Sequence, residues 1–410
     1  MSRAIPKWEP IEGDLATPVG FRAAAVAAGI KKSKDALDLA LIFSDSPATA
    51  AAGVFTTNRV AAAPVLLSRQ NLLESRGRCR AIVVNSGNAN ACTGRAGMRA
   101  AEESARVAGE LLGIESSQVL VASTGVIGVT LDADLILQQL PHLKEKLSKE
   151  NAGKVAHAIM TTDTFPKTCV VRSAVKGKAV HIAGIAKGAG MIHPRMATML
   201  SFITTDASMG ERMLHNLLQG AAEDSFNRVT VDGDTSTNDT LLALASGLSE
   251  LAVIPGNDSR AWFAEGLTQL CQTLARMIAR DGEGASKLVT VEVVGARTPL
   301  DADRVARAIA NSPLVKTALA GSDPNWGRII CAAGYSGAKF DPNKIDVSVN
   351  NMALCRKGVD AGFEEAAAHS ELDRKEIVLQ VDLHAGRATA RVWTCDFTRD
   401  YIDINASYRS

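Results

Sequence analysis

The sequence predicts an α/β fold in which helices pack on sheets with much antiparallel pairing. Strand-like and helix-like segments alternate along the 410 residues. Two pairs of neighbouring strand-like segments also flank short polar turns, a pattern typical of hairpins rather than of strict βαβ alternation. The composition, 46% hydrophobic and 22% charged, is that of a globular chain long enough for two or three domains. Composition alone places no boundary between them.

The first part of the chain predicts two strand–helix units. Residues 81–85 (AIVVN) form a short apolar run that ends in the turn-rich segment SGNANACTG, and residues 95–112 then have the periodicity of an amphipathic helix. QVLVAS at 118–123 predicts another strand, closed by a Thr124-Gly125 turn. A helix is expected over 132–147.

The remainder predicts hairpins and longer helices. Residues 168–174 and 179–185 flank Lys-Gly-Lys and predict one hairpin. EIVLQVDL and ATARVWTCDF bracket the four residues 384–387 and predict a second hairpin. The other expected elements are a buried strand at 199–205, a helix at 209–226 and a helix at 258–280 that stops at Asp281-Gly282.

Charge, aromatic content and cysteine usage exclude several classes of protein. A net charge of +1 and 4% aromatic residues argue against a partner that is a nucleic acid. No apolar run approaches 18 residues and the N-terminus has no signal-like segment, so we expect no membrane association and a cytoplasmic location. The cysteines are odd in number, widely spaced and typical of reduced thiols: Cys79, Cys92, Cys169, Cys271, Cys331, Cys355 and Cys395.

Common cofactor and metal motifs are absent from the sequence. It contains no GxxxxGK[ST], HExxH or GxSxG pattern, and its seven histidines include no closely spaced pair. DGDTSTND at 232–239 resembles a calcium loop, but Thr237 stands where that loop needs Gly and Ala243 where it needs Glu. We therefore interpret this segment as a polar structural turn and expect neither a metal nor a cofactor.

The segment KGAGMIHPRMATMLSFITTDA, residues 187–207, is chemically the most informative. Read locally, it is a turn that enters a buried strand. A sharper hypothesis is that the Thr198 hydroxyl attacks the Ala197 carbonyl, because a small residue precedes a hydroxyl in a tight turn. Hydrolysis of the resulting ester would make Thr198 a new N-terminus. Its α-amine, with an unperturbed pKa of about 7.7–8.0, would then be a built-in base.

Motifs along the whole chain resemble, in order, the ornithine acetyltransferase family, the glutamate N-acetyltransferases of the arginine pathway. Two departures, His193 and Arg195, lie near the predicted scissile bond and bear on the rate of self-cleavage, not on the resemblance. Besides 187–207, the motifs are GVFTTNRVAAAPV at 53–65, NSGNANACTG at 85–94, STGVIG at 123–128, MTTDT at 160–164, DGDTSTNDT at 232–240, GSDPNWGRI at 321–329 and WTCDFTRDYIDINASYRS at 393–410.

The resemblance implies a fold and an assembly. The fold would be a two-layer-core αββα sandwich of mixed, largely antiparallel sheets. Self-cleavage would divide the chain into an α chain, 1–197, and a β chain, 198–410, intertwined in one assembly. The family forms a heterotetramer with two copies of each chain.

The resemblance also implies roles for individual residues. Thr198 would be the nucleophile of both cleavage and acetyl transfer, and Thr124 and Gly125 the donors of an oxyanion hole. The implied substrate contacts are Lys187, Glu283, Asn405, Ser410 and one threonine of MTTDT, where Thr161 is favoured and Thr162 and Thr164 compete. Without the resemblance, Thr124-Gly125 would be a strand-to-helix turn, Lys187 and Glu283 solvated charges, and the C-terminus a frayed tail.

The implied reaction is a ping-pong acetyl transfer without a cofactor. Thr198 would take the acetyl group of N²-acetylornithine, release ornithine and pass the acetyl group to L-glutamate. Some family members also accept acetyl-CoA, and both alternatives stay open for this chain. Two other readings also stay open: an N-terminal-nucleophile aminopeptidase that shares the Thr198 chemistry, and a degenerate member that remains uncleaved.

Overall fold

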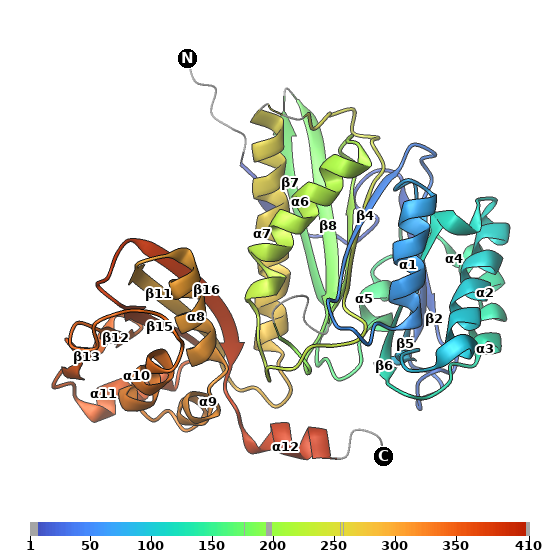
Figure 1. Cartoon of the computed structure of the whole chain (residues 1–410). Helices are drawn as coiled ribbons and strands as arrows, with labels where there is room; N and C mark the ends of the chain where they lie inside the picture. The colour runs from blue at the N-terminus through green and yellow to red at the C-terminus, as the bar shows by residue number, and fades with distance from the viewer. Residues whose placement is uncertain (1–6, 176, 194–198, 255, 257, 407–410) are drawn as a thin grey trace. The chain divides into compact units, whose positions relative to one another are not determined.

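The computed structural model describes residues 7–175, 177–193, 199–254, 256 and 258–406 (Figure 1). The chain divides into two compact units, and neither is one continuous stretch of sequence. The first comprises Met1–Gly188, Arg195–Asn227 and Thr235–Leu274, and the second Ala189–Pro194, Arg228–Asp234 and Ala275–Ser410. The predicted cleavage point after residue 197 does not coincide with this division, because sequence from both sides of it belongs to the first unit.

Two sheets pack face to face in the first unit. Phe21, Ile82 and Leu120 of the smaller sheet share a core with Phe202 and Leu242 of the larger one. The smaller sheet has the order β2 (Phe21–Val26), β3 (Leu39–Ser44), β5 (Ala81–Asn88), β6 (Val119–Val126). The larger sheet has the order β1 (Glu9–Ile11), β7 (Lys167–Val175), β8 (Lys178–Lys187), β9 (Leu200–Thr205), β10 (Thr240–Ala245), β4 (Ala50–Phe55).

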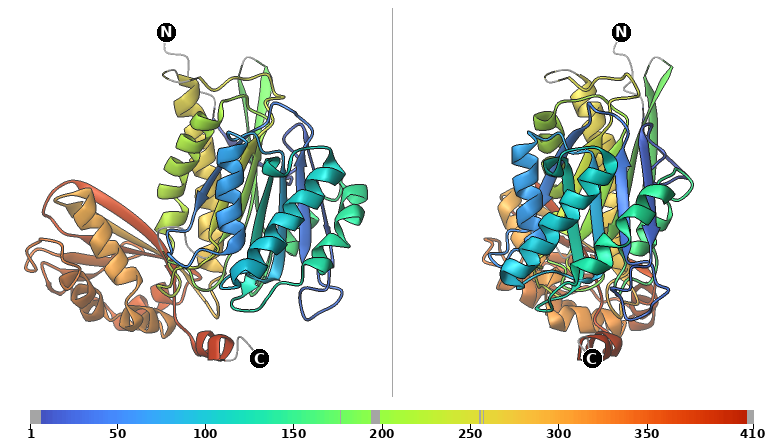
Figure 2. Two further views of the ribbon diagram at one scale, coloured as in Figure 1. Left: turned by 45° about the vertical axis from the view of Figure 1, so that its right-hand side comes forward. Right: turned by 90° about the vertical axis from the view of Figure 1, so that its right-hand side faces the viewer.

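Helices cover the outer faces of both sheets. Ala101, Ala105 and Ala108 of α2 pack with residues of α3 and α4 on the outer face of the smaller sheet. On the larger sheet, α6 and α7 cross in front of β7 and β8 (Figures 1 and 2). The layers are therefore α, β, β, α, which confirms the predicted fold class. The helices are α1 (Ala63–Glu74), α2 (Gly94–Leu112), α3 (Ala133–Leu137), α4 (Leu140–Lys146), α5 (Lys154–Ala158), α6 (Glu211–Glu223) and α7 (Asp258–Arg280), the last of which runs on into the second unit.

Strand pairing is largely antiparallel, as predicted. Among the described strands, the parallel pairs are β5–β6, β9–β10 and, in the second unit, the pair of β11 with β15. β7 and β8 form the hairpin that the sequence predicts at 168–185, with Lys167 opposite Ala186 at one end and Val175 opposite Lys178 at the other.

The second unit is one sheet whose core faces a group of helices. Val289 and Val291 of the sheet pack with Val305 and Ile309 of α8 in a single buried cluster. The strand order is β14 (Val359–Asp360), β13 (Met352–Arg356), β12 (Asp346–Val349), β15 (Glu376–Asp382), β11 (Leu288–Ala296), β16 (Ala388–Cys395). The helices are α8 (Pro299–Ala310), α9 (Pro313–Ala320), α10 (Trp326–Gly334), α11 (Glu365–Leu372) and α12 (Arg399–Ala406).

Two sequence predictions are wrong in detail. β15 and β16 do not form a hairpin, because β11 lies between them, parallel to β15 and antiparallel to β16. The single helix expected over 132–147 is two helices, α3 and α4. Pro141 lies in the first turn of α4, and proline is tolerated there but not in a helix interior, where it lacks a needed N–H.

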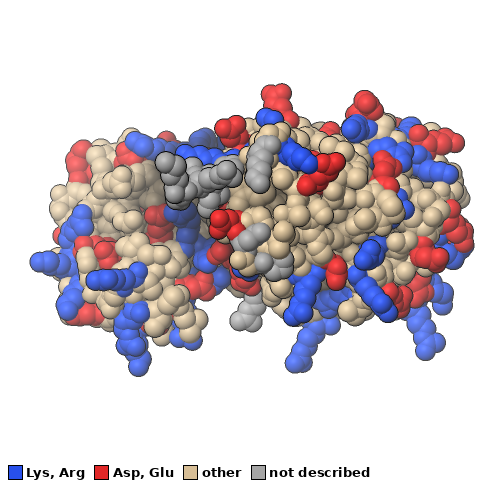
Figure 3. All heavy atoms as spheres, turned by 90° about the horizontal axis from the view of Figure 1, so that it is seen from above, with Lys and Arg blue, Asp and Glu red and all other residues tan. Residues whose placement is uncertain are grey.

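The surface carries both signs of charge. On the face drawn in Figure 3, Lys and Arg side chains lie among Asp and Glu side chains rather than in one basic field. Within the described residues, no helix is both long and apolar enough to cross a membrane.

Candidate active site

Thr124 and Gly125 lie at the end of β6, where the ladder with β5 becomes irregular. Gly87 pairs with Gly125, and the register shifts between Gly87 and Asn88. Thr124 is buried, with 5% of its surface exposed. The turn predicted at Thr124-Gly125 is therefore wrong, because both residues belong to β6 and the neighbouring strand β5 pairs with them.

Gly125 is required at its position by both conformation and space. Its φ is +133°, a value that L-residues with side chains rarely adopt. A Cβ there would lie 2.3 Å from the carbonyl carbon of Gly87 and 2.5 Å from the backbone nitrogen of Asn88. The close approach of these two strands fixes the backbone that the resemblance assigns to the oxyanion hole.

Lys187 and Thr161 meet in the same unit. Lys187 is the last residue of β8, and Thr161 follows α5 in the loop that leads to β7. Lys187 Nζ donates a hydrogen bond of 2.7 Å to Thr161 Oγ1. The Lys187 side chain is only 4% exposed, so it is not the solvated surface charge that a lone lysine usually is.

Asp163 organises this buried cluster. Its Oδ1 accepts hydrogen bonds from Lys167 Nζ at 2.6 Å and from the Gly188 N–H at 2.7 Å. Its Oδ2 accepts the Thr161 N–H at 3.0 Å and lies 3.8 Å from Lys187 Nζ. The Asp163 carboxylate thus binds the backbone N–H of Thr161 and that of Gly188, the residue that follows Lys187.

The charges in this cluster favour an ionised Asp163. Burial acts to raise the pKa of its carboxyl, but the positive charges of Lys187 and Lys167, with the hydrogen bonds from Lys167 and the Thr161 N–H, hold that pKa well below its usual range. Lys31 lies within electrostatic reach, and burial lowers its pKa while Asp38 and Asp163 oppose that shift. A cluster rich in lysine is suited to binding the carboxylate of an amino-acid substrate.

The backbone directly after the predicted nucleophile lies at the same end of the larger sheet. Lys187 pairs with Leu200, and Leu200 pairs with Thr240 on the other side. The Met199 N–H donates to Asp239 Oδ1 at 3.1 Å, and the Met199 carbonyl accepts the Thr240 N–H at 3.0 Å. Hydrogen bonds therefore hold both the N–H and the carbonyl group of Met199.

Glu283 and Asn405 meet in the second unit. Asn405 Nδ2 donates a hydrogen bond of 2.8 Å to Glu283 Oε2, and the Glu283 N–H donates to the Ala189 carbonyl at 2.8 Å. Glu283 is 7% exposed. A Cβ on Gly190 would lie 2.2 Å from Glu283 Oε2, so glycine at that position leaves room for the carboxylate.

Some predicted site residues fall outside the described part of the chain. These are Ala197, Thr198 and Ser410. Of the others, the structure brings Lys187 to Thr161 and Glu283 to Asn405. Thr162 is partly buried and Thr164 is exposed.

The sequence assigned no role to several aspartates that hold the backbone around the candidate site, although each lies within one of the motifs that carry the resemblance. Asp163 belongs to MTTDT, and Asp239 to DGDTSTNDT. Asp232, in the segment that resembles a calcium loop, accepts the N–H groups of Met191 at 2.5 Å and Ile192 at 2.8 Å. Within the described ranges, no three His, Cys, Asp or Glu side chains are grouped as a metal would require.

Comparison with known proteins identifies the family. The ArgJ family model matches residues 22–410. The chain belongs to the ArgJ family. The arginine biosynthesis bifunctional protein ArgJ of Symbiobacterium thermophilum is 49% identical over 404 residues, which cover 98% of this chain and 100% of that protein. The protein of the same name from Caldanaerobacter subterraneus is 47% identical, with 98% and 100% covered. As an ArgJ-family member, the chain is an acyltransferase of arginine biosynthesis.

Two solved ArgJ-family structures are also similar in sequence. The arginine biosynthesis bifunctional protein ArgJ of Bacillus halodurans is 44% identical, with a TM-score of 0.49, and covers 50% of this chain and 98% of its own. The ornithine acetyltransferase of Mycobacterium tuberculosis, complexed with ornithine, is 40% identical, with a TM-score of 0.43, and covers 47% of this chain and 100% of its own.

Proposed function

We propose that the chain transfers the acetyl group of N²-acetylornithine to L-glutamate, which gives ornithine and N-acetylglutamate. The observation that carries this proposal is the similarity to bifunctional ArgJ proteins over 98% of the chain. The ArgJ-family relative that was crystallised with ornithine supports the choice of the amino-acid donor.

The proposed reaction begins with self-cleavage between Ala197 and Thr198. The Thr198 hydroxyl attacks the Ala197 carbonyl, the amide bond gives way to an ester, and water hydrolyses the ester. Residue 198 then carries a free α-amine next to its hydroxyl. β8 precedes the cleavage point and β9 follows it, and residues 182–187 pair with 200–205, so the 1–197 and 198–410 chains would stay associated. The proposed assembly is a heterotetramer of two copies of each.

Acetyl transfer then proceeds in two halves. The α-amine takes the proton of the Thr198 hydroxyl while its oxygen attacks the acetyl carbonyl. The bond to the ornithine nitrogen breaks, that nitrogen receives a proton, and acetyl-threonine remains. The glutamate amine attacks this ester and loses a proton, and the Thr198 hydroxyl is restored. In both halves Thr124 and Gly125 stabilise the oxyanion, where each preorganised donor contributes roughly 2.7–4 kcal/mol.

Substrate binding is assigned to the two clusters described above. Lys187, which is paired with Asp163 and hydrogen-bonded to Thr161, binds the substrate carboxylate. Glu283 and Asn405 receive the amino end, and Ser410 completes the contacts. The relatives are named bifunctional, which favours a second donor in this chain also, and acetyl-CoA is the donor that the resemblance implies.

Isotope exchange tests the proposal. With acetylornithine and labelled ornithine but no glutamate, the label should enter acetylornithine, because the first half-reaction is complete in itself. Double-reciprocal plots with both substrates varied should be parallel. Exchange that requires glutamate, together with intersecting lines, would contradict the covalent intermediate. Release of amino acids from peptides, without stimulation by glutamate, would favour the aminopeptidase alternative.

A further inference from the structure

Lys31 is a half-buried lysine on the loop that joins β2 to β3, next to the end of β5. A Cβ added to Gly87 would lie 3.1 Å from Lys31 Cγ and 3.2 Å from the carbonyl carbon of Ile30. Gly87 pairs with Gly125 on β6. The loop that carries Lys31 therefore contacts the strand that holds the predicted oxyanion backbone.

Asp38 holds this loop through its backbone. It is fully buried, and its Oδ1 accepts the N–H of Ala28 at 2.6 Å. Its Oδ2 accepts the N–H groups of Ile30 at 2.6 Å and Lys31 at 2.9 Å. Its carbonyl accepts the Ser86 N–H of β5 at 2.9 Å. The position of Lys31 is thus set by the backbone of the loop and does not depend on the charge of its side chain.

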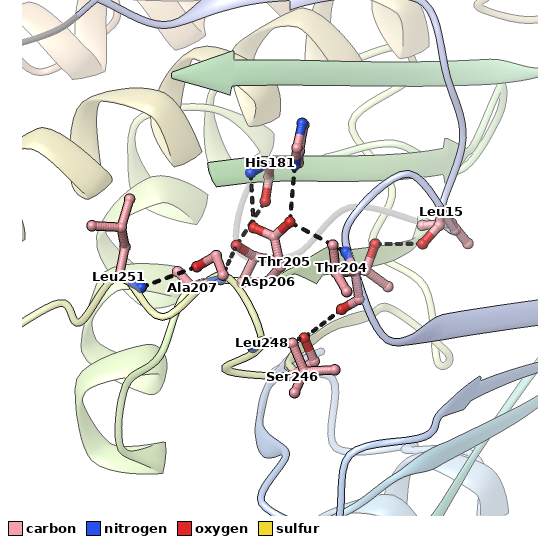
Figure 4. A network of polar contacts seen from close by, with 11 residues as sticks. Leu15, His181, Thr204, Thr205, Asp206, Ala207, Ser246, Leu248 and Leu251 are labelled. Atoms are coloured by element: carbon pink, nitrogen blue, oxygen red, sulfur yellow. Dashed lines mark hydrogen bonds and ion pairs between the residues drawn. The ribbon is translucent and has the colours of Figure 1, made fainter. Parts of the chain in front are cut away.

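The Lys31 ammonium has no carboxylate partner in the described part of the chain. His181, another half-buried basic side chain of the first unit, shows the more usual arrangement. Its Nδ1 lies 2.9 Å from Oδ2 of the buried Asp206 (Figure 4). Lys31 Nζ instead donates one hydrogen bond, of 2.8 Å, to the carbonyl of Leu37. An ammonium group has further N–H donors, which are available to a ligand.

The charges around Lys31 favour an anionic ligand. Burial lowers the pKa of the Lys31 ammonium, and the positive charge of Lys187 acts in the same direction. The negative charges of Asp38 and Asp163 oppose this shift. Asp163 is already paired with Lys167 at 2.6 Å and lies 3.8 Å from Lys187. An anion that binds Lys31 would therefore supply the ion pair that this half-buried cation lacks, and such charge-assisted hydrogen bonds are strong.

The two proposed substrates differ in the charge of their side chains. N²-acetylornithine ends in an ammonium group, and L-glutamate ends in a second carboxylate. Glu283 is assigned to the amino end of the donor, where like charge would repel a carboxylate. Lys187 is assigned to the carboxylate that both substrates share. The second carboxylate of glutamate therefore needs another cation, and Lys31 is within electrostatic reach of Lys187.

We propose that Lys31 determines the specificity for the acetyl acceptor: its ammonium binds the side-chain carboxylate of glutamate while Lys187 binds the α-carboxylate. This inference rests on the proposed function and names the residue that distinguishes the acceptor from the donor. Asp38 is a positioning residue, because it holds the backbone of the loop that carries Lys31. Lys31 takes no part in the half-reaction that releases ornithine.

The Lys31→Met variant tests the charge with little change in side-chain length. Glutamine is the matched acceptor, because an uncharged amide replaces the side-chain carboxylate of glutamate. We expect the wild type to prefer glutamate over glutamine at least about tenfold in kcat/KM, and Lys31→Met to reduce this preference to within about threefold. The kcat/KM for glutamate should fall at least about tenfold. Exchange of labelled ornithine into acetylornithine, which needs no glutamate, should stay within about twofold.

Lys34 is the control, because it is an exposed lysine on the same loop. Lys34→Met should leave both the exchange and the preference for glutamate within about twofold of the wild type. The exchange also separates charge from structure. Since Lys31 contacts Gly87, a displaced loop would slow ornithine exchange as much as transfer to glutamate. Lys31→Gln gives the same test if the methionine variant does not fold.

Four results would overturn the inference. They are a wild type that uses glutamine as well as glutamate, a Lys31 variant that keeps the preference, an equal loss of exchange and glutamate transfer, and the same loss in Lys34→Met. A loss confined to acetylation from acetyl-CoA would assign the ammonium to a phosphate group and would equally contradict the proposal. Wild-type protein that exchanges no ornithine would contradict the proposed function itself, which is a different result from an unchanged preference in an active variant.

Discussion

Lys187 Nζ lies 2.7 Å from Thr161 Oγ1, so the end of β8 and the loop after α5 meet through one buried hydrogen bond. The opposite end of the same strand carries Lys178, whose pairing with Glu250 is exposed to solvent. The two lysines share a residue type and a strand but differ in burial. This difference permits a controlled test of the proposed substrate carboxylate site.

Lys187→Met should weaken substrate binding strongly. It removes the positive charge proposed for the substrate carboxylate, and a hydrogen bond to a charged group contributes about 1.5–3 kcal/mol. We expect kcat/KM to fall about tenfold to a hundredfold, chiefly through KM. Steady-state kinetics with acetylornithine and glutamate measures this. Lys178→Met is the control and should stay within about twofold, since exposed ion pairs contribute little. Equal losses in both variants would assign the effect to the strand and not to the site.

Asp163→Asn should destabilise the first unit in a pH-dependent manner. Removing this carboxylate leaves Lys167 and Lys187 without their shared negative partner, which costs about 3–5 kcal/mol for a buried pair. Because the folded-state pKa of Asp163 is depressed, its stabilisation is present above the unfolded pKa of about 3.9 and is lost as pH falls through the folded value.

Chemical denaturation at several pH values measures this difference. The difference in unfolding free energy between wild type and Asp163→Asn should have its largest value at pH 7 and should decrease below about pH 4. Asp45→Asn, which removes the exposed partner of Arg22, should change stability by less than about 1 kcal/mol at any pH. A gap for Asp163→Asn that stayed constant down to pH 3 would argue against an ionised Asp163 in the folded chain.

Gly125→Ala should disrupt the end of β6. Its Cβ would approach the Gly87 carbonyl carbon to 2.3 Å, at a φ of +133°. We expect acetyl transfer to fall at least about a hundredfold, as for loss of an oxyanion donor, with reduced thermal stability. Gly128→Ala shares the positive φ, +81°, but its Cβ would meet no atom within 4 Å. It should lose only about 1 kcal/mol and keep its activity. Similar activity in both variants would contradict the requirement for glycine at position 125 in acetyl transfer.

Glu283→Ala should weaken acetyl transfer while the two-chain pattern survives, because Glu283 is assigned to substrate binding and not to cleavage. Gly190→Ala should reproduce part of this loss without removing the carboxylate, since its Cβ would lie 2.2 Å from Glu283 Oε2. Gly334→Ala, where no atom lies within 4 Å of the added carbon, is the control. Kinetics and a denaturing gel measure the two effects. Unaltered kinetics in Glu283→Ala would return Glu283 to the role of an ordinary loop carboxylate.

The layers of the fold and most of its elements could be predicted from local pattern. The 258–280 helix and the 168–185 hairpin were evident because periodicity and turn residues report local geometry. The separation of β15 from β16 was not evident, because β11, the strand that lies between them in the sheet, comes about eighty residues earlier in the chain than β15. Local sequence carries no signal for a partner so distant. The break at Pro141, in contrast, was present in the sequence.

Only part of the candidate site, likewise, could be predicted from the sequence. Lys187 and Thr161 came from resemblance, and the structure adds the Asp163 carboxylate that joins them. Asn238 and Asp239 were interpreted as part of a polar turn, since their partners, Ser123 and Met199, lie 115 and 40 residues away in sequence. Their burial is a property of the folded chain and could not be deduced from residue type, because Asn and Asp are usually exposed.

The most direct test of the account is to determine the mass and N-terminal sequence of the purified chain. We predict two fragments, about 21 and 22 kDa from the 43.1 kDa mass scaled by length, with Thr198 as the N-terminus of the second. Thr198→Ala should remain a single chain and transfer no acetyl group. A wild-type chain that remains intact at full length yet transfers acetyl groups at full rate would contradict the N-terminal threonine mechanism.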